Sequence, residues 1–242
     1  MTATIDQTRP ADGSKWVFDS GVASVFDNML ARSIPGHDTM RQLVLDLGSR
    51  FVQDNTDVVD LGCSRGAALQ PFVDRFGNQC RYVGLDESGP MIDAARQRFA
   101  REIDAGFVRI LDHDLRRGVP PVLASLTLAV LTLQFVPIEY RQGLVADVFR
   151  STRLGGALIV VEKTLGPDSA TQALFVNRYH ALKRENGYTA EQVRAKAESL
   201  QGVLVPLTPE GNEQMLRAEG FKVSRFWQHL NFCGWLAIKE TR

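Results

Sequence analysis

Apolar residues recur along this chain with two different periods, and the alternation between those periods predicts the fold. Short β-branched or apolar runs after residue 56 predict strands near 56–61, 80–85, 105–111, 125–133 and 156–162. Apolar positions at helical spacing between these runs predict helices near 65–76, 89–101 and 138–152. This alternation is typical of a doubly wound α/β fold, with a parallel sheet and ligands at the carboxyl ends of its strands.

The two ends of the chain depart from this alternation. Two amphipathic helices are predicted before the sheet, separated by a turn at 34–37, with apolar faces formed by Val22, Val25, Phe26, Met29 and Leu30 and by Met40, Leu43, Val44, Leu47 and Phe51. Thr208-Pro209 begins a late helix that Gly220 ends. Strands near 221–229 and 231–239 should then form an antiparallel edge of the sheet.

Residues 167–201 predict two helices where the alternation calls for a single crossover. Thr189 and Gln192 have the spacing of a capping box for the second of them. We expect this segment to form a helical lid over the strand ends, although a packing or dimerisation arm would give the same pattern. Residues 1–14 are expected to be a flexible tail, and 15–242 a single domain that carries the lid.

The clearest chemical signal is the run Val58-Val59-Asp60-Leu61-Gly62-Cys63-Ser64-Arg65-Gly66. Its glycines permit a sharp turn and bring backbone N–H groups close to a ligand at a helix N-terminus. A second apolar run, 82–85, ends in Asp86, and an acid at the tip of the second strand suits the two hydroxyls of a ribose. A cofactor that contains a nucleoside is therefore predicted.

The spacing of the glycines separates the classes of cofactor. A dinucleotide site needs G-x-G-x-x-G, but Ser64 stands where the middle glycine would be. A phosphate-binding P-loop needs a Gly-Lys-Ser/Thr end, which is also missing. The observed D-x-G-x-x-x-G form is similar to that of the class I S-adenosylmethionine (SAM) methyltransferases, in which the turn holds the methionine part of the cofactor.

Composition narrows the possible partners and the compartment. Lys plus Arg and Asp plus Glu number 28 each, so the formal net charge is zero, which argues against a large nucleic-acid footprint. No apolar run approaches transmembrane length, and residues 1–14 lack the blocks of a signal peptide. The three cysteines are isolated, which favours a reducing cytoplasm and no metal site. We expect a cytoplasmic protein with a small-molecule substrate.

A more specific resemblance runs from about residue 16 to 239. The chain resembles the carboxy-S-adenosyl-L-methionine (carboxy-SAM) synthases, a branch of the class I methyltransferase fold. The matching stretches are Trp16–Asp19, Val25-Phe26, Arg32–Gly36, Asp60–Ser64 with Gly66–Ala68, Thr132–Phe135, Gly155–Leu158 with Glu162-Lys163, Lys183-Arg184 with Asn186–Tyr188, and Asn231-Phe232. Members of that family convert SAM and prephenate into carboxy-SAM, which is used in wobble-uridine modification of tRNA.

The resemblance also implies, by analogy with the family, roles for individual residues and an assembly. It places Gly62, Cys63, Ser64 and Gly66 at the methionine side of SAM. It places Asp86 and Glu87 at the ribose and adenine edge, and Asp114 and Leu115 at the adenine. SAM, or S-adenosyl-L-homocysteine (SAH) as its product, is the implied cofactor, and a homodimer is the implied assembly.

Three departures from the family pattern fall at the ligands. This chain has His37 where the family has a tyrosine at the ligand, and Val130 where the family has an asparagine that contacts the cofactor. It has Ala197 where the family has the arginine that binds the extra carboxylate of carboxy-SAM. Loss of such an arginine leaves a desolvated carboxylate, at a cost of about 3–5 kcal/mol, or two to three decades of affinity at about 1.4 kcal/mol per tenfold. Arg194, three residues earlier, is a possible substitute. Gln134 and Tyr188 complete the predicted substrate pocket.

We therefore expect methyl transfer from plain SAM to an unidentified small molecule, with carboxy-SAM synthesis as the alternative. A noncatalytic SAM-binding protein is a third possibility. Methyl transfer needs positioning of the two reactants, and a general base only where the acceptor must lose a proton. The candidates for a base or orienting group are His37, Tyr179, His180 and Glu162. Three of them have structural alternatives: His37 as a turn histidine, Tyr179 as a core residue, and Glu162 as a carboxylate paired with Lys163 or a lid arginine.

Overall fold

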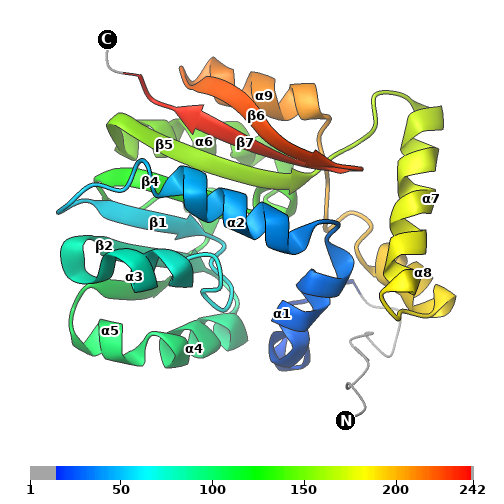
Figure 1. Cartoon of the computed structure of the whole chain (residues 1–242), viewed down its shortest axis with the longest axis horizontal. Coiled ribbons are helices and arrows are strands. Elements are labelled where there is room, and N and C mark those ends of the chain that lie inside the picture. Colours follow the sequence, from blue (N-terminus) through cyan, green and yellow to red (C-terminus); the bar gives the residue numbers. More distant parts are fainter. Residues whose placement is uncertain (1–14, 241–242) are drawn as a thin grey trace.

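A computed structural model describes residues 15–240 of the chain, and Figure 1 shows the arrangement of its elements. The predicted tail, 1–14, lies outside the described residues. The helices are α1 (Ser20–Ser33), α2 (His37–Gly48), α3 (Gln70–Phe76), α4 (Gly89–Arg98), α5 (Ala100–Asp104), α6 (Ile138–Ser151), α7 (Ser169–Glu185), α8 (Ala190–Ser199) and α9 (Pro209–Ala218). Three short 3₁₀ turns are η1 (Gly77–Gln79), η2 (Leu115–Arg117) and η3 (Leu133–Phe135).

One sheet of seven strands forms the centre of the molecule. Its strands are β1 (Asp57–Leu61), β2 (Arg81–Asp86), β3 (Val108–Asp112), β4 (Ala124–Val130), β5 (Thr152–Lys163), β6 (Lys222–His229) and β7 (Phe232–Ile238). They lie in the order β3-β2-β1-β4-β5-β7-β6, parallel from β3 to β5, with β7 antiparallel to β5 and β6 antiparallel to β7. The predicted α/β class, with its antiparallel C-terminal edge, is confirmed.

Alternation along each strand divides the core into two layers. Val58 belongs to the cluster that also contains residues of α2, α3 and α4, whereas its neighbour Val59 belongs to the cluster with residues of α6 and α9. Successive side chains of a strand point to opposite faces of the sheet, so buried strands carry apolar residues at every position. The helices thus cover both faces of the sheet (Figure 1).

The turn after β1 is longer than the sequence predicts. The helix expected from residue 65 begins at Gln70, because the intervening residues follow a turn rather than a helix. Ser64 (φ 48°) and Gly66 (φ 77°) are in the left-handed region, which a right-handed helix cannot include. The predicted strand 125–133 also ends early, at Val130, and Leu133–Phe135 form η3 instead.

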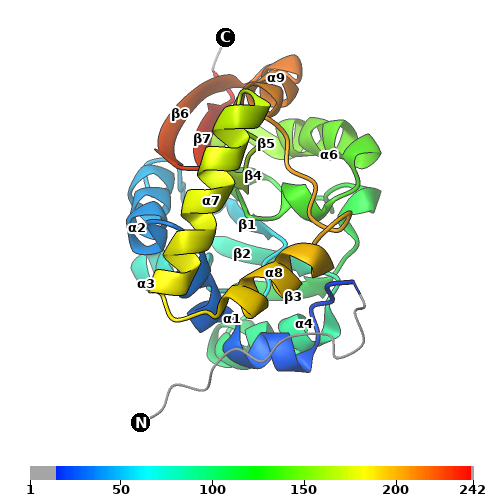
Figure 2. The same ribbon diagram turned by 90° about the vertical axis from the view of Figure 1, so that its right-hand side faces the viewer.

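Two helices, α7 and α8, form the inserted segment, and we call them the lid helices. The side chain of Asp168 accepts hydrogen bonds from the N–H groups of Ala170 and Thr171 at the start of α7. The predicted capping box of Thr189 and Gln192 is present at the start of α8. Figure 2, which looks onto the carboxyl ends of the central strands, shows both lid helices in front of them, with α1 alongside.

Candidate active site

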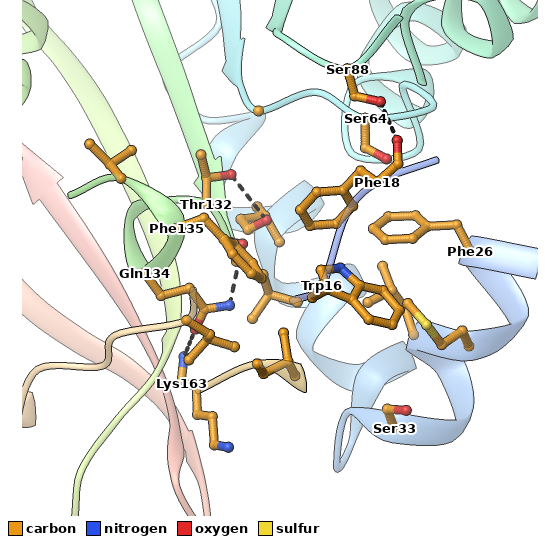
Figure 3. Close-up of a pocket in the computed structure, with 18 of the residues that line it drawn as sticks. Trp16, Phe18, Phe26, Ser33, Ser64, Ser88, Thr132, Gln134, Phe135 and Lys163 are labelled. Atoms are coloured by element: carbon orange, nitrogen blue, oxygen red, sulfur yellow. Dashed lines mark hydrogen bonds between the residues drawn. The ribbon is translucent and has the colours of Figure 1, made fainter. Parts of the chain in front are cut away.

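A cavity of about 400 Å³ lies between the strand ends, α1 and the lid helices. That volume is near the lower end of the range of roughly 300–1,000 Å³ for ligand sites. Figure 3 shows Ser64 and Ser88 at one end of the cavity and Ser33 and Lys163 at the other, with the rings of Trp16, Phe18 and Phe135 between them. We call the first end the nucleoside end and the second the lysine end.

Asp86 organises the nucleoside end. One oxygen of its carboxylate accepts the N–H of Ser64 at 2.8 Å, and the other accepts the N–H of Ser88 at 2.9 Å. Burial raises the pKa of Asp86, while the hydrogen bonds from Ser88, Ser64 and Glu87 oppose that rise. A carboxylate has about four acceptor positions, so it retains capacity for a ribose hydroxyl. Asp86 and Glu87 both line the cavity, and they fit a nucleoside.

The glycine turn lies beside Asp86, but only part of it reaches the cavity. Gly62 and Ser64 line the wall, whereas Cys63 is buried and its N–H donates to Leu85. Gly66 also lies behind the wall. Its N–H donates to the carbonyl of Cys63 at 2.7 Å, and a side chain at this position would collide with Phe99. Gly66 therefore allows close packing of the turn on α4, and its N–H is used within the turn.

The third strand end contributes Asp114 and Leu115, which both line the cavity. The Asp114 carboxylate accepts hydrogen bonds from the backbone N–H and the guanidinium of Arg116, each at 2.9 Å. These bonds cap η2 and lower the pKa of Asp114, with the Arg116 side chain as the main cause. The loop after β3 is thereby held against the nucleoside end, next to His113.

Glu162 lies behind the cavity wall. Its carboxylate accepts the N–H groups of Thr132, Leu133 and Gln134 at 2.7–3.0 Å, and it is 2% exposed. Burial raises its pKa to about 8, although these N–H groups and Arg141 favour the charged form. The bonds from three successive N–H groups secure the start of η3, whose residues form one wall. Glu162 pairs with neither Lys163 nor a lid arginine, because alternation along β5 sends the two neighbouring side chains to opposite faces.

Gln134 links this wall to β5. Its side-chain oxygen accepts the N–H of Lys163 at 3.0 Å, and its amide N–H donates to the carbonyl of Leu131 at 3.3 Å. Figure 3 shows these two bonds and the Lys163 side chain that extends beyond them. Gln134, predicted for the substrate pocket, and Val130, predicted as a cofactor contact, both line the cavity. The amide of Gln134 is engaged with backbone groups.

The lysine end is formed by β5 and the lid helices. Lys163, Tyr179, His180 and Lys183 line it, and the ammonium of Lys163 lies 5.1 Å from the centre of the Tyr179 ring. Burial lowers the pKa of His180, and the charges of Lys183, Lys163 and Arg184 lower it further. A neutral imidazole, which can accept a proton, is therefore favoured here.

Ala197 of α8 also lines the cavity. Its neighbour Lys196 lines it too, with its ammonium 4.3 Å from the centre of the Trp16 ring. The wall where the family resemblance implies a guanidinium thus presents a methyl group. Arg194 is exposed and does not line the cavity.

An extended segment, residues 15–18, crosses the cavity between the lid and β2. The N–H of Trp16 donates to the carbonyl of Ser199 at 3.0 Å, and the hydroxyl of Ser88 donates to the carbonyl of Phe18 at 2.6 Å. The Phe18 ring lies edge-on to Phe135, with centroids 5.2 Å apart. We call this segment the strap.

Two further predicted site residues lie away from the cavity wall. His37 is the first residue of α2, and its imidazole lies 3.1 Å from the carboxylate of Asp38. Tyr188 is buried, with the guanidinium of Arg32 stacked on its ring at 4.3 Å from the centroid. Tyr188 therefore joins the lid to α1, whereas His37 is half-buried at the start of α2.

The sequence reasoning assigned no role to the strap or to Lys163, Lys183 and Lys196. A signal for Lys183 was present, since it follows Tyr179 and His180 by four and three residues on one helix and so shares their face. Lys163 ends a buried strand at the mouth where ligands bind, but it was considered only as a partner of Glu162. The strap has no periodic signal, because an extended segment has no period of its own, and its match to the family at Trp16–Asp19 does not show that it crosses a cavity.

No group of three or more His, Cys, Asp or Glu residues between 15 and 240 is arranged to hold a metal ion. Within the same described range, no helix has the length and apolar character required to cross a membrane.

Comparisons with known proteins agree with this geometry. A family model described as a methyltransferase domain matches residues 58–156. Carboxy-S-adenosyl-L-methionine synthase of Methylococcus capsulatus is 37% identical over 224 residues, which are 92% of this chain and 93% of that protein. The synthase of the same name from Erwinia tasmaniensis is 36% identical over 98% of this chain and 96% of its own length.

Solved structures support the fold alone, because the sequences are distant. An O-methyltransferase family protein of Burkholderia thailandensis superposes with a TM-score of 0.63 at 18% identity. The match covers 92% of this chain and 61% of that one. Human N-acetylserotonin methyltransferase, solved with SAM, superposes with a TM-score of 0.60 over 92% of this chain and 56% of its own. By its identity to these synthases over nearly its whole length, the chain belongs to the carboxy-S-adenosyl-L-methionine synthase family, and it is a SAM-dependent transferase of the class I methyltransferase superfamily.

Proposed function

We propose that this protein transfers the methyl group of SAM to a small molecule that binds at the lysine end of the cavity. The observation that carries the proposal is the wall at Ala197, where a methyl group faces the cavity and Arg194 lies outside it. A carboxylate on the transferred group would lose its bidentate partner there. Plain SAM has no such carboxylate and needs no such partner.

The residues of the nucleoside end fit the cofactor. Asp86 supplies acceptors for the ribose hydroxyls, and Gly62 with Ser64 forms the wall for the methionine part. When bound, SAM supplies an electrophilic methyl group on a sulfonium. The protein contributes position: the strap and η3 hold the walls, and the acceptor must reach the methyl group in line with the bond that breaks. The rings of Trp16, Phe18 and Phe135 lie between the two ends, where their apolar surfaces offer water few hydrogen-bond partners.

Where the acceptor must lose a proton, we propose His180 as the base, with Tyr179 as its neighbour in the wall. Of the four predicted catalytic residues, these two line the cavity, whereas His37 and Glu162 do not. The nearby lysines favour the neutral imidazole, which takes the proton as the acceptor atom bonds to the methyl carbon. With SAM bound, the carbon–sulfur bond would break in the same step as the new bond forms, so that SAH would be the second product.

Carboxy-SAM synthesis remains the second candidate, and a specific observation favours it. Lys163, Lys183 and Lys196 all line the cavity, so its wall carries positive charge even without the arginine. The near full-length identity to named carboxy-SAM synthases points the same way.

Mass spectrometry of the ligand that co-purifies with the protein separates the two candidates. The methyl-transfer proposal expects SAM or SAH, whereas the mass of carboxy-SAM would overturn it. Incubation with SAM and prephenate tests the same point through its product. Formation of carboxy-SAM supports the second candidate, and recovery of unchanged SAM supports the first. Absence of any SAH binding in calorimetry would exclude both.

The variant Ala197→Arg tests directly whether the methyl group at this wall is what prevents carboxy-SAM recognition. Arginine at this position should raise the affinity for carboxy-SAM by about tenfold or more, because it restores a charge-assisted pair. The affinity for SAM should change less. Glu198→Arg, the adjacent exposed position, is the matched control for the added charge. No gain in Ala197→Arg would contradict the assignment of this wall.

We also propose, by analogy with the family, a cytoplasmic homodimer that makes no direct contact with nucleic acid. The zero net charge supports the absence of a nucleic-acid footprint. Size-exclusion chromatography with light scattering tests the assembly, and a monomer mass would contradict it.

A further inference from the structure

Lys163 is held rigidly at its backbone while its charge faces the cavity. It is the last residue of β5, and its N–H donates to the side chain of Gln134 at 3.0 Å. Val161 of the same strand belongs to the core cluster that contains Tyr179, and alternation places Lys163 on that same face. Its ammonium lies 5.1 Å from the centre of the Tyr179 ring. The charge is therefore fixed at the lysine end.

No carboxylate in the described part of the chain lies within ion-pair distance of this ammonium. The acidic residues of the cavity wall, Asp86, Glu87 and Asp114, come from β2 and β3 at the nucleoside end. Burial lowers the pKa of Lys163, and no neighbouring acid opposes that effect. A half-buried ammonium with an aromatic contact but without a carboxylate is under-compensated, because a charge withdrawn from water normally has an ionic partner.

The surroundings of Lys163 extend the positive potential along α7. Lys183 is 4% exposed, and its ammonium lies 5.4 Å from the ring centres of both Tyr179 and Tyr188. The charges of Lys183 and Lys163 both act on His180. The cavity is thus polarised, with acids at the nucleoside end and cations at the other.

We propose that Lys163 binds a carboxylate of the acceptor, and that the acceptor is a small, largely apolar acid. This inference rests on the proposed function, since it identifies the substrate class at the same site. Lys183 adds positive potential, the neutral imidazole of His180 adds hydrogen-bonding capacity, and the rings of Tyr179 and Phe232 suit an apolar body.

The lining favours a carboxylate over a phosphate. Phosphate sites combine several donors, such as a helix N-terminus or arginines. In the described part of the chain, Arg116 is the arginine of the cavity wall, and it lies at the nucleoside end, paired with Asp114. A single rigid ammonium beside aromatic rings matches one carboxylate on an apolar molecule.

The test uses carboxylates and their neutral amides as matched probes. Acetate, benzoate and phenylacetate, their three amides, and inorganic phosphate are titrated onto the full chain by calorimetry, with and without SAH. At least one carboxylate should bind about tenfold more tightly than its amide, as expected for a charge-assisted contact. In Lys163→Met this preference should fall to within about twofold, while Lys163→Arg should retain it. Lys222→Met, at an exposed lysine of β6, is the control and should change nothing.

Each other outcome overturns the inference. If every carboxylate binds as tightly as its amide, or if no carboxylate binds at all, the site does not recognise the charge. An unchanged preference in Lys163→Met would assign it to another cation. Tighter binding of phosphate than of any carboxylate would contradict the substrate class. The titration of SAH itself tests the proposed function. If the protein does not bind SAH but still prefers the carboxylates, the proposed function is wrong and the carboxylate subsite stands.

Discussion

Ser64 and Asp86 are joined by a hydrogen bond of 2.8 Å across 22 positions of sequence, from the N–H of the serine to the carboxylate of the aspartate. Ser64 is in the left-handed region, with φ of 48°, which is uncommon for a residue other than glycine. The acid at the tip of β2 therefore holds the turn after β1 as well as facing the cavity. The glycine turn and the acid at the end of β2, which the sequence presents as two separate signals for the cofactor, are therefore joined by a direct hydrogen bond.

Replacement of Asp86 by asparagine should weaken both the turn and the cofactor site. The amide keeps one oxygen but turns an NH₂ group toward one of the two N–H donors that the carboxylate accepts. We expect a loss of about 1–3 kcal/mol in the free energy of unfolding and a fall in SAH affinity of tenfold or more. Denaturant unfolding and calorimetry measure the two effects. Asp112→Asn, at the exposed end of neighbouring β3, is the control; an equal loss there would refute the prediction.

Gly62 should not tolerate a side chain. An added Cβ would lie 2.6 Å from the Thr132 methyl group, and φ is 64°. We expect Gly62→Ala to cost more than the roughly 1–2 kcal/mol of a left-handed alanine, with loss of SAH binding because the wall at Thr132 must move. Gly202 also has a positive φ, 73°, but an added Cβ there would meet no other atom. Gly202→Ala therefore measures the cost of the left-handed backbone without a collision. Equal destabilisation of the two variants would show that the collision is unimportant.

Two buried acids should make the protein less stable as the pH rises toward 8. Burial raises the pKa of Asp60 from 3.8 to about 7 and that of Glu162 from 4.5 to about 8. Between the unfolded and folded values the native state holds the extra protons, so the free energy of unfolding falls as pH rises. The slope per group reaches at most about 1.4 kcal/mol per pH unit.

Denaturant unfolding from pH 5 to 8 measures this slope. Asp60→Asn and Glu162→Gln should each flatten the profile relative to the wild type, because the neutral side chain has no proton to lose. Asp54→Asn, at an exposed acid, should leave the profile unchanged. A wild-type stability that rises throughout this window, with no difference in the variants, would contradict the assignment.

The strap should be required for cofactor retention. Phe18→Ala removes the ring that contacts Phe135, Phe26 and Trp16, so water gains access to the middle of the cavity. Each aromatic pair contributes about 0.5–1.5 kcal/mol beyond its buried area, and we expect SAH affinity to fall about tenfold. Val17→Ala changes an adjacent side chain that is 64% exposed and should have no effect on SAH binding. Unaltered SAH affinity in Phe18→Ala would mean that the strap does not cover the cofactor.

The sequence by itself determined the fold class, the family and the cofactor of this protein. Buried parallel strands and amphipathic helices have their own periods, and a glycine turn followed by Asp86 needs few neighbours to be recognised, so these features are local. The capping box of Thr189 and Gln192 was predicted from the same kind of short-range pattern and is present. Each of these interactions spans only a few residues.

Only the tertiary structure decided which polar side chains face the cavity. The sequence did not distinguish Glu162 from Lys163, although one caps η3 behind the wall and the other enters the lysine end. It also did not place Arg194 outside the cavity or bring the strap across it. These outcomes depend on how β5, the lid helices and residues 15–18 pack together, and no local period specifies contacts between segments more than a hundred residues apart.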